Sequence, residues 1–506
     1  MYCCHWNVEK CKTFIGMWKC SCHSPVYTRK KALSHLFMTT TVGATGFLGK
    51  LILEKLLRTC PDLNKIYILL RAKKGQNQHE RLEALLNQPC FEEMKVLTPD
   101  FRQKIQILNG DCGAPFLGLS FQDRALLEEV TCVIHSAAVV KFNVKLKSAI
   151  YTNVRAVRDL IILARNMPKL KSFIYVSTAF SHCIRNEIGE EFYDVGVNPD
   201  DIISMVQGFD DDILEQLTPH VLGKWPNCYV YSKALAEQLF KNESLPFSIV
   251  RPAIVGSACQ EPIPGWIDNF QGIVGISIGV SMGVLRSLQI DPKLRANIVP
   301  VDFVVNTVLA SGWYCQKSKK IIYNFVGTDL NPITWSVVVD KLSNYAFKYP
   351  MSNAIWYPNF SVTPNTAVHK IRVFFSHTLY AYFIDAIFYL LGKKRIAVKK
   401  YKKIGELTDC LSYFTLRSWK FSDENVRKLW MKMSNNDRRY FNFDMEKLEW
   451  ENYGENCVVG GRIHLMKDPL ETVPRARKRL FALFVIHYGF IFLVLYTFYK
   501  FITWVV

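Results

Sequence analysis

The sequence lacks a disulfide framework. Of its 15 cysteines, five lie within the first 22 residues and the other ten are scattered singly. An odd total with irregular spacing favours free thiols in a reducing, cytosol-facing compartment. No apolar segment follows the initiating methionine, so no secretory signal is indicated. We expect residues 1–36 to form an atypical, Cys-rich, disordered leader. Because its cysteines and histidines fit no zinc-finger spacing, no metal site is predicted.

Acidic residues are few relative to basic ones. The chain has 63 Lys and Arg against 44 Asp and Glu, a formal net charge of +19. Two basic clusters, at 393–403 and 475–479, lie beside apolar segments. Basic clusters in that position favour an anionic membrane surface or a polyanionic substrate, so nucleic acid is not the expected partner. Repeats and low-complexity segments are also missing.

Long uncharged apolar runs are scarce, and one stands out. Leu480–Tyr499 contains 20 residues without a formal charge, enough to cross a hydrocarbon core of about 30 Å. Basic residues just before it keep the large N-terminal portion in the cytosol by the positive-inside rule. We therefore expect 480–506 to be a transmembrane tail anchor; a buried hairpin helix is the alternative. Ile371–Leu391 is also apolar but carries charges, which favours a buried or membrane-surface helix.

Short apolar runs alternate with helical patterns in the first part of the chain. The runs begin at Lys65, Ile105, Cys132, Ser172 and Phe247. Strands alternating with helices predict a doubly wound, Rossmann-type parallel sheet. We expect this α/β domain to occupy 37–345. The composition then becomes aromatic and basic, which predicts a second, helical domain over 350–470.

A glycine-rich loop opens the α/β part. Gly43, Gly46 and Gly49 form G-x-x-G-x-x-G before a helical pattern. Such a loop lets a pyrophosphate approach the backbone at a helix N-terminus. The predicted cofactor-binding residues of this loop are Gly43, Thr45, Gly46, Phe47, Leu48 and Gly49. The preceding strand is unusual, because Thr39, Thr40 and Thr41 replace the apolar residues of a buried strand. We expect the strand to form, with a less stable nucleotide half and weak cofactor binding.

Charged residues after the next two strands bear on the choice of cofactor. Arg71 and Lys73 stand where an NAD-type site would carry a carboxylate. A guanidinium can bind the 2′-phosphate that a carboxylate would repel, so NADPH is favoured over NADH. The alternative is that Arg71 only solvates the strand end. Asp111 follows the third strand, where it would accept from the adenine amino group or cap a helix.

The catalytic candidates lie on a strand end and a helix. Tyr229 and Lys233 form Y-x-x-x-K, so they share one helix face. A neighbouring ammonium lowers the pKa of a phenol, which suits Tyr229 as general acid for a carbonyl oxygen that receives a hydride. The same lysine would hold the nicotinamide ribose. Ser177 and Thr178 follow an apolar strand, and Thr178 is the predicted partner of the substrate carbonyl.

The motifs together resemble one family. "GATGFLGK", "YVSTAF", "YSKALAE", "VRPAIVG", "EPIPGWIDNF" and "IVPVDFVVN" are similar to those of alcohol-forming fatty acyl-CoA reductases, which are extended short-chain dehydrogenases. "FFSHTLYAYFIDAIFYLLGKK" and "DRRYFNFDMEKLEWENY" resemble their C-terminal domain. "EPIPGWIDNF" is the most specific of these motifs.

The resemblance implies an activity and a location. It implies NADPH-dependent reduction of a long-chain acyl-CoA to an aldehyde and then an alcohol, with Tyr229, Lys233 and Thr178 as catalytic residues. It further implies a tail-anchored peroxisomal enzyme that supplies alcohols for ether lipids and waxes. A homo-oligomer is left open. Two alternatives remain: a membrane-bound 3β-hydroxysteroid dehydrogenase-like oxidoreductase, and a pseudoenzyme impaired by its altered first strand.

Overall fold

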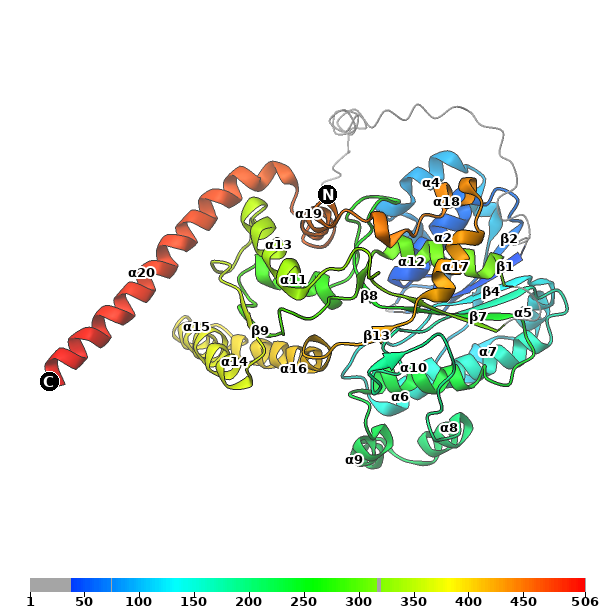
Figure 1. The fold of residues 1–506 in the computed structure, drawn as a ribbon, viewed down its shortest axis with the longest axis horizontal. Coiled ribbons are helices and arrows are strands. Elements are labelled where there is room, and N and C mark those ends of the chain that lie inside the picture. Colours follow the sequence, from blue (N-terminus) through cyan, green and yellow to red (C-terminus); the bar gives the residue numbers. More distant parts are fainter. Residues whose placement is uncertain (1–37, 74, 316–319, 506) are drawn as a thin grey trace. The chain divides into compact units, whose positions relative to one another are not determined.

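The computed structural model describes residues 38–73, 75–315 and 320–505 (Figure 1). The leader expected over residues 1–36 lies outside the described residues. The main sheet has seven parallel strands in the order β11-β7-β5-β4-β1-β2-β3. The strands are β1 (Met38–Val42), β2 (Lys65–Leu70), β3 (Ile105–Asn109), β4 (Cys132–His135), β5 (Ser172–Val176), β7 (Phe247–Pro252) and β11 (Ile321–Phe325). This topology confirms the predicted doubly wound sheet and adds β11, a strand that the sequence had not singled out.

The helices that cover this sheet alternate with its strands along the chain. On one face lie α2 (Phe47–Thr59), α4 (Glu92–Leu97) and α12 (Val301–Trp313); on the other lie α6 (Leu146–Ile150), α7 (Ala156–Arg165) and α10 (Cys228–Gln238) (Figure 1). Two layers of helices exclude water from both faces of a parallel sheet, which is why most of its strands read as continuous apolar runs. Other helices of this half are α3 (Gln78–Leu86), α5 (Phe121–Leu126), α8 (Pro199–Gly208), α9 (Asp211–Leu222) and α11 (Gly272–Ser281).

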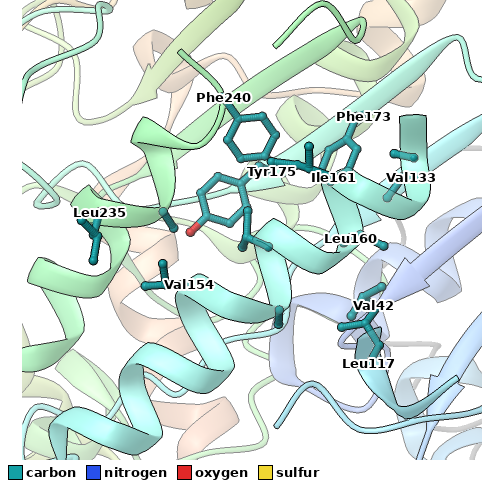
Figure 2. Packing of buried hydrophobic residues seen from close by; sticks show 14 of the residues in the cluster. Val42, Leu117, Val133, Val154, Leu160, Ile161, Phe173, Tyr175, Leu235 and Phe240 are labelled. Carbon is teal, nitrogen blue, oxygen red and sulfur yellow. The ribbon is translucent and has the colours of Figure 1, made fainter. Parts of the chain in front are cut away.

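The Thr-rich strand β1 forms at the centre of the sheet. It pairs with β2 and β4, so Thr40 lies between Tyr67 and Val133. Its three threonines are at most 2% exposed, and among the described residues their hydroxyls have no hydrogen-bond partner. Val42 ends the strand inside the main hydrophobic cluster, where Figure 2 shows it beside Leu117. The strand is therefore built as expected, with its hydroxyls buried and unpaired.

Aromatic rings fill the other side of the same cluster. Tyr175 stacks on Phe240 with ring centroids 5.3 Å apart, and Phe173 meets Phe240 edge-on at 5.4 Å (Figure 2). Since Phe173 and Tyr175 belong to β5 and Phe240 follows α10, these contacts fix the helix that carries Tyr229 and Lys233 against the sheet.

The chain beyond Pro350 packs on the α/β part. Its elements are β12 (Ser361–Thr363), α14 (Thr366–Val373), the π-helical turn η6 (Phe374–Thr378), α15 (Leu379–Leu390), α16 (Ala397–Thr415), β13 (Lys420–Phe421), α17 (Glu424–Lys432), α18 (Asn435–Tyr440), α19 (Trp450–Gly460), η8 (Gly461–Leu465) and α20 (Val473–Val505). They follow β6 (Glu187–Ile188), β8 (Ile254–Val255), β9 (Ser287–Gln289), β10 (Ile298–Val299) and α13 (Trp335–Lys348). β13 pairs with β6, β12 pairs with β9, and α17 contacts β11 and α12. The domain boundary expected near residue 350 stays a prediction, and the contacts across it are extensive.

Among the residues that the structure describes, two helices are long and apolar enough to cross a membrane by length and composition: Thr366–Leu390 and Leu470–Trp504. The first combines α14, η6 and α15, and the second includes α20 as far as Trp504. The predicted span Leu480–Tyr499 lies within the second.

Candidate active site

A cleft of about 1160 Å³ opens at the carboxyl ends of the central strands. The glycine loop between β1 and α2 lines one end of it, and residues of α16 line the other. Thr178, Tyr229 and Lys233 lie in its wall. A ligand site at this edge is expected for an open parallel sheet, because the strand order reverses there. The predicted cofactor residues and catalytic residues are thus brought to one cavity.

Backbone geometry explains two of the loop glycines. Gly43 has a φ of +102°, and a Cβ there would lie 2.6 Å from the backbone nitrogen of Ala137. A Cβ on Gly49 would collide with the carbonyl oxygen of Gly43. Only glycine permits the turn at the first position and the close approach of α2 at the second. The loop therefore keeps its shape despite the threonines before it.

Helix α2 presents its N-terminus to the cleft. Gly46 is the N-cap residue and offers no side chain to the first-turn N–H groups. Thr45, Phe47 and Leu48 line the cleft around them. Free N–H groups and the positive end of the helix dipole favour a phosphate at this position. The residues present fit the pyrophosphate of a dinucleotide.

Two arginines lie near this loop. Arg71 Nη1 donates to Asp111 Oδ2 at 2.6 Å, and both side chains are partly exposed. Arg81 of α3 donates to the backbone carbonyl of Arg71, and its Nη2 lies 3.5 Å from Thr45 Oγ1. Burial and the charge of Arg71 lower the pKa of Arg81. Sequence reasoning missed Arg81; the signal was a basic residue in the first turns of the helix that follows β2.

Asp111 and Lys73 are two further predicted cofactor-binding residues, and both lie at the edge of the cleft. Burial acts to raise the pKa of Asp111, but the Gly113 N–H and the Arg71 guanidinium lower it below its usual value. Both oxygens of the ionised Asp111 carboxylate are engaged: Oδ2 accepts from Arg71, and Oδ1 accepts from the backbone N–H of Gly113. Lys73 is exposed at the cleft edge and closes a backbone turn with Gln76.

Tyr229 lies in the first turn of α10, where the Asn227 side chain caps the helix by accepting from Val230 N at 3.1 Å. Burial raises the pKa of Tyr229 to about 12, against the opposing effect of its hydrogen bond with the Thr178 hydroxyl. The phenol is therefore protonated at neutral pH and lies beside the strand-end hydroxyl. This arrangement brings together the predicted proton donor and the predicted carbonyl partner.

Lys233 lies one helical turn further along. It is 2% exposed, its Nζ donates to the carbonyl oxygen of Val176 at 2.6 Å, and it lies 4.7 Å from the centroid of the Tyr175 ring. Burial lowers the pKa of Lys233 to about 7, although Glu237 acts in the opposite direction. The amino group is thus bound to the end of β5. Burial and Thr178, rather than Lys233, set the pKa of Tyr229 in this state.

A buried polar network holds the end of β5. Glu237 accepts from Ser177 Oγ at 2.5 Å and from Ser181 Oγ at 3.1 Å, and its second oxygen lies 2.9 Å from His182 Nε2. Arg251 Nη2 donates to the same carboxylate at 2.6 Å. Burial acts to raise the pKa of Glu237, but Arg251 and His182 outweigh it and lower the pKa. Ser177 therefore serves this network, which leaves Thr178 to face the cleft.

Aromatic side chains line the wall next to Tyr229. Phe142 lies 6.2 Å from the Tyr229 ring and stacks on Phe414 at 5.4 Å. Phe180 meets Phe414 edge-on at 5.4 Å. Phe414 and Leu411 come from α16. An apolar wall beside the predicted proton donor suits an aliphatic substrate group.

The segment "EPIPGWIDNF" lies against the glycine loop. Trp266 stacks on Phe47 with ring centroids 5.6 Å apart, and Asp268 forms an ion pair with Lys50 of α2. Asp302 holds the start of the segment by accepting from the N–H groups of residues 259–261. The most specific motif of the sequence thus supports the cofactor loop.

Comparisons with known proteins agree with this site. Two family profiles, both described as "Male sterility protein", match the chain. The first, for an NAD-binding domain, matches residues 41–308, and the second, named "Sterile", matches residues 376–468. The chain is 40% identical over 452 residues to "Fatty acyl-CoA reductase wat" of Drosophila melanogaster, covering 88% of this chain and 87% of that protein. The chain belongs to the fatty acyl-CoA reductase family.

Other members of this family are similarly close. Fatty acyl-CoA reductase 1 of Mus musculus is 38% identical over 454 residues, with 88% of each chain covered, and fatty acyl-CoA reductase 2 of Homo sapiens is 38% identical over 455 residues with the same coverage. The assignment confirms the predicted family and makes the chain an NAD(P)-dependent oxidoreductase. It also decides against the steroid dehydrogenase alternative.

Solved structures share the fold of this reductase. The terminal R domain of the myxalamid biosynthetic pathway aligns with a TM-score of 0.56 at 21% identity, covering 85% of this chain and 91% of that one. The reductase domain of a non-ribosomal peptide synthetase from Mycobacterium tuberculosis gives 0.55 at 19% identity, covering 88% and 94%. These likenesses confirm the Rossmann-type architecture.

Proposed function

We propose that this chain reduces long-chain fatty acyl-CoA to fatty alcohol with NADPH, through an enzyme-bound aldehyde. The observation that carries the proposal is the position of Tyr229 and Thr178. Their hydroxyls interact within a cleft that runs from a dinucleotide-type glycine loop to an aromatic wall. The family relationship supplies the substrate class.

The roles of the residues follow from their positions. When bound, the nicotinamide supplies a hydride to the carbonyl carbon. Tyr229 donates its proton to the carbonyl oxygen, because a pKa of about 12 keeps the phenol protonated at neutral pH. Thr178 orients the same oxygen, and Lys233, fixed on the Val176 carbonyl, holds the ribose. Collapse of the resulting hemithioacetal releases CoA and leaves the aldehyde, which the same residues protonate in a second reduction.

The preference for NADPH rests on two cations. Arg71 and Arg81 lie together beside Thr45 of the glycine loop. Because a 2′-phosphate carries a negative charge that NADH lacks, two neighbouring guanidinium groups favour the phosphorylated cofactor. The remaining binding residues are Gly43, Thr45, Gly46, Phe47, Leu48, Gly49, Lys73 and Asp111.

We further propose that α20 anchors the reductase in the peroxisomal membrane, with the cleft facing the cytosol. The apolar side chains of α20 are exposed along most of its length, and Arg475–Arg479 precede the apolar run. Removal of 480–506 should let alkaline carbonate extract a chain that otherwise resists extraction. A truncated chain that still resists carbonate would place the anchor elsewhere.

Product analysis tests the activity. The purified protein, incubated with NADPH and palmitoyl-CoA, should consume twice as much NADPH as the CoA it releases, and gas chromatography should identify hexadecanol. Free aldehyde without alcohol would contradict the second reduction. Intact acyl-CoA after exhaustive incubation, together with no measurable NADPH binding, would instead support the pseudoenzyme that the altered β1 suggested.

A further inference from the structure

The continuous helix α14–η6–α15 exposes an apolar face. Ten large hydrophobic side chains between Ile371 and Leu391 are exposed, and Leu390 is 82% accessible. Most of them recur every three or four positions, which places most of this apolar surface along one side of the helix. They are Ile371, Phe374, Phe375, Leu379, Tyr382, Phe383, Ile387, Tyr389, Leu390 and Leu391. An apolar surface of this extent marks an interaction site; we call it the α15 face.

The opposite side of the same helix is polar and bound to the protein. Asp385 accepts from the backbone N–H groups of residues 396–398 at 2.8–3.0 Å and so holds the start of α16. His377 accepts from the backbone N–H of Arg286 at 3.0 Å, and His369 lies 2.9 Å from Ser287 Oγ. Each of these three helix side chains is at most 7% exposed.

These contacts decide how the helix can meet a bilayer. A helix that crossed the membrane would have to leave β9 and α16 and carry Asp385 into hydrocarbon without its three donors. Charged groups at that depth are costly. A helix with one polar face on the protein and one apolar face outward is instead the pattern of an interfacial helix.

A basic cluster follows the α15 face directly. Its members are all exposed, and none of them forms an ion pair with any residue that the structure describes. They are Lys393, Lys394, Arg395, Lys399, Lys400, Lys402 and Lys403. Unpaired cations next to an apolar helix face match the negative headgroups and the hydrocarbon boundary of an anionic leaflet.

The helix that carries the α15 face is also linked to the proposed anchor through Trp356. The Trp356 ring lies 4.9 Å from Tyr380 of α15, and its Nε1 donates to His487 Nδ1 of α20 at 3.1 Å. His487 is seven residues beyond Leu480, the first residue of the apolar run, which is about 10 Å along a helix. Interfacial helices sink about 5–10 Å below the headgroup boundary. The depth of the contact on α20 therefore agrees with an α15 face lying in the interface.

We infer that the α15 face and the basic cluster dock this reductase onto the surface of an anionic bilayer. The inference rests on the proposal that α20 is a membrane anchor and adds a second, interfacial contact. It also orients the cleft. Lys400 and Leu411 are both on α16, about 17 Å apart along its axis. Leu411 and Phe414 line the apolar end of the cleft, so docking brings this end close to the lipid in which a long acyl chain dissolves.

Photocrosslinking tests the inference with the full chain. The protein is reconstituted in nanodiscs that contain a photoreactive phospholipid, and the modified peptides are mapped by mass spectrometry. We expect crosslinks within 371–391 as well as within α20. Changing the other lipids from neutral to anionic should raise the yield at 371–391 by at least about fivefold, the effect of one basic residue near an anionic surface. The yield on α20 should stay constant.

Two variants sharpen the result. Phe375→Glu with Phe383→Glu and Leu390→Glu should abolish crosslinks at 371–391, leaving those on α20 and the thermal unfolding midpoint unchanged. Phe121→Glu is the matched control, because this α5 side chain is 88% exposed and should change no crosslink. Lys399→Glu with Lys400→Glu, Lys402→Glu and Lys403→Glu should remove the preference for anionic lipid.

Other outcomes would overturn the inference. Crosslinks on α20 alone would leave the anchor and remove the docking surface. Crosslinks between two copies of the chain at 371–391 would make this face an oligomer interface. Loss of all lipid crosslinks would remove anchor and docking together. A chain that docks as described but fails to reduce acyl-CoA would refute the proposed activity only.

Discussion

Phe47 of the glycine loop stacks on Trp266, with ring centroids 5.6 Å apart and planes inclined by 22°. The two residues are far apart in the sequence, so the stack is a tertiary support for a local motif. Trp266 is 2% exposed and is itself held near α2, since Lys50 Nζ lies 5.9 Å from its ring centroid. The stack therefore supports the N-terminus of α2, the helix end that would meet the pyrophosphate.

Phe47→Leu should therefore weaken cofactor binding. Leucine keeps most of the apolar volume but loses the aromatic pair, which is worth about 0.5–1.5 kcal/mol. If the loop must be ordered for binding, the Kd for NADPH should rise by about twofold to tenfold in fluorescence titration. Phe121→Leu, on exposed α5, is the control. An unchanged Kd would show that the loop holds its shape without the stack.

Tyr229→Phe should abolish turnover and leave NADPH binding nearly intact. In the proposed mechanism the phenol protonates the reacting oxygen, and loss of a general acid costs on the order of 10²–10⁴ in rate. Tyr231→Phe is the matched control, because its ring is buried against Trp225 at 5.5 Å. Steady-state rates with palmitoyl-CoA separate the two. If the Tyr229→Phe enzyme stayed active and the Tyr231→Phe enzyme were inactive, Tyr231 would be the proton donor and the proposed assignment would be wrong.

Arg71→Gln with Arg81→Gln should lower affinity for NADPH far more than for NADH. A charge-assisted hydrogen bond contributes about 1.5–3 kcal/mol, so the NADPH Kd should rise by at least about tenfold. Arg102→Gln is the control, since Arg102 pairs with Glu83 at the surface. Equal losses for both cofactors would place the two arginines at a group that NADH and NADPH share.

Thr40→Val should stabilise the protein. The hydroxyl is buried and has no partner among the residues that the structure describes, and burying such a group costs about 1–3 kcal/mol. Valine has nearly the same shape and keeps the preference for a strand. Thr98→Val is the matched control, because its buried hydroxyl donates to the Leu57 carbonyl at 3.1 Å and its loss should destabilise. Chemical denaturation measures both; a destabilised Thr40→Val protein would indicate that the hydroxyl has a partner.

Glu237→Gln should lower the free energy of unfolding at neutral pH and leave it less dependent on pH in the acid range. Arg251 and His182 lower the pKa of Glu237 in the folded state, below the value of about 4.3 in the unfolded chain. Its contribution is then complete above the unfolded pKa and is lost as pH falls through the folded pKa. Leaving Arg251 buried without its partner should cost about 3–5 kcal/mol at neutral pH. Unfolding curves should show this difference shrinking below about pH 4.

The control for this pair is Glu83→Gln. Glu83 and Arg102 form an ion pair with both side chains about half exposed, so its loss should cost less than about 1 kcal/mol. A cost for Glu237→Gln as small as this one would show that the buried network does not stabilise the end of β5.

The sequence by itself determined the sheet and the local motifs. A strand buried on both faces is mostly apolar, so runs such as Lys65–Leu70 could be predicted as strands from the sequence. At a φ of +102°, with the Ala137 backbone close by, only glycine fits, which explains the residue at Gly43. Helical spacing placed Tyr229 and Lys233 on one face of α10. The sequence signal for each of these features lies within a few neighbouring positions.

Only the tertiary structure decided the partners of these groups. Nothing near Lys233 in sequence indicates that its ammonium binds the carbonyl of Val176. The order of residues likewise hides that Phe414, from a helix far beyond the α/β core, stacks on Phe142 beside the proton donor. Side-chain partners depend on how whole elements pack, and packing is set by shape and burial over the entire chain rather than by local pattern. For the same reason the exposure of the α15 face became visible only when its polar side was seen bound to β9 and α16.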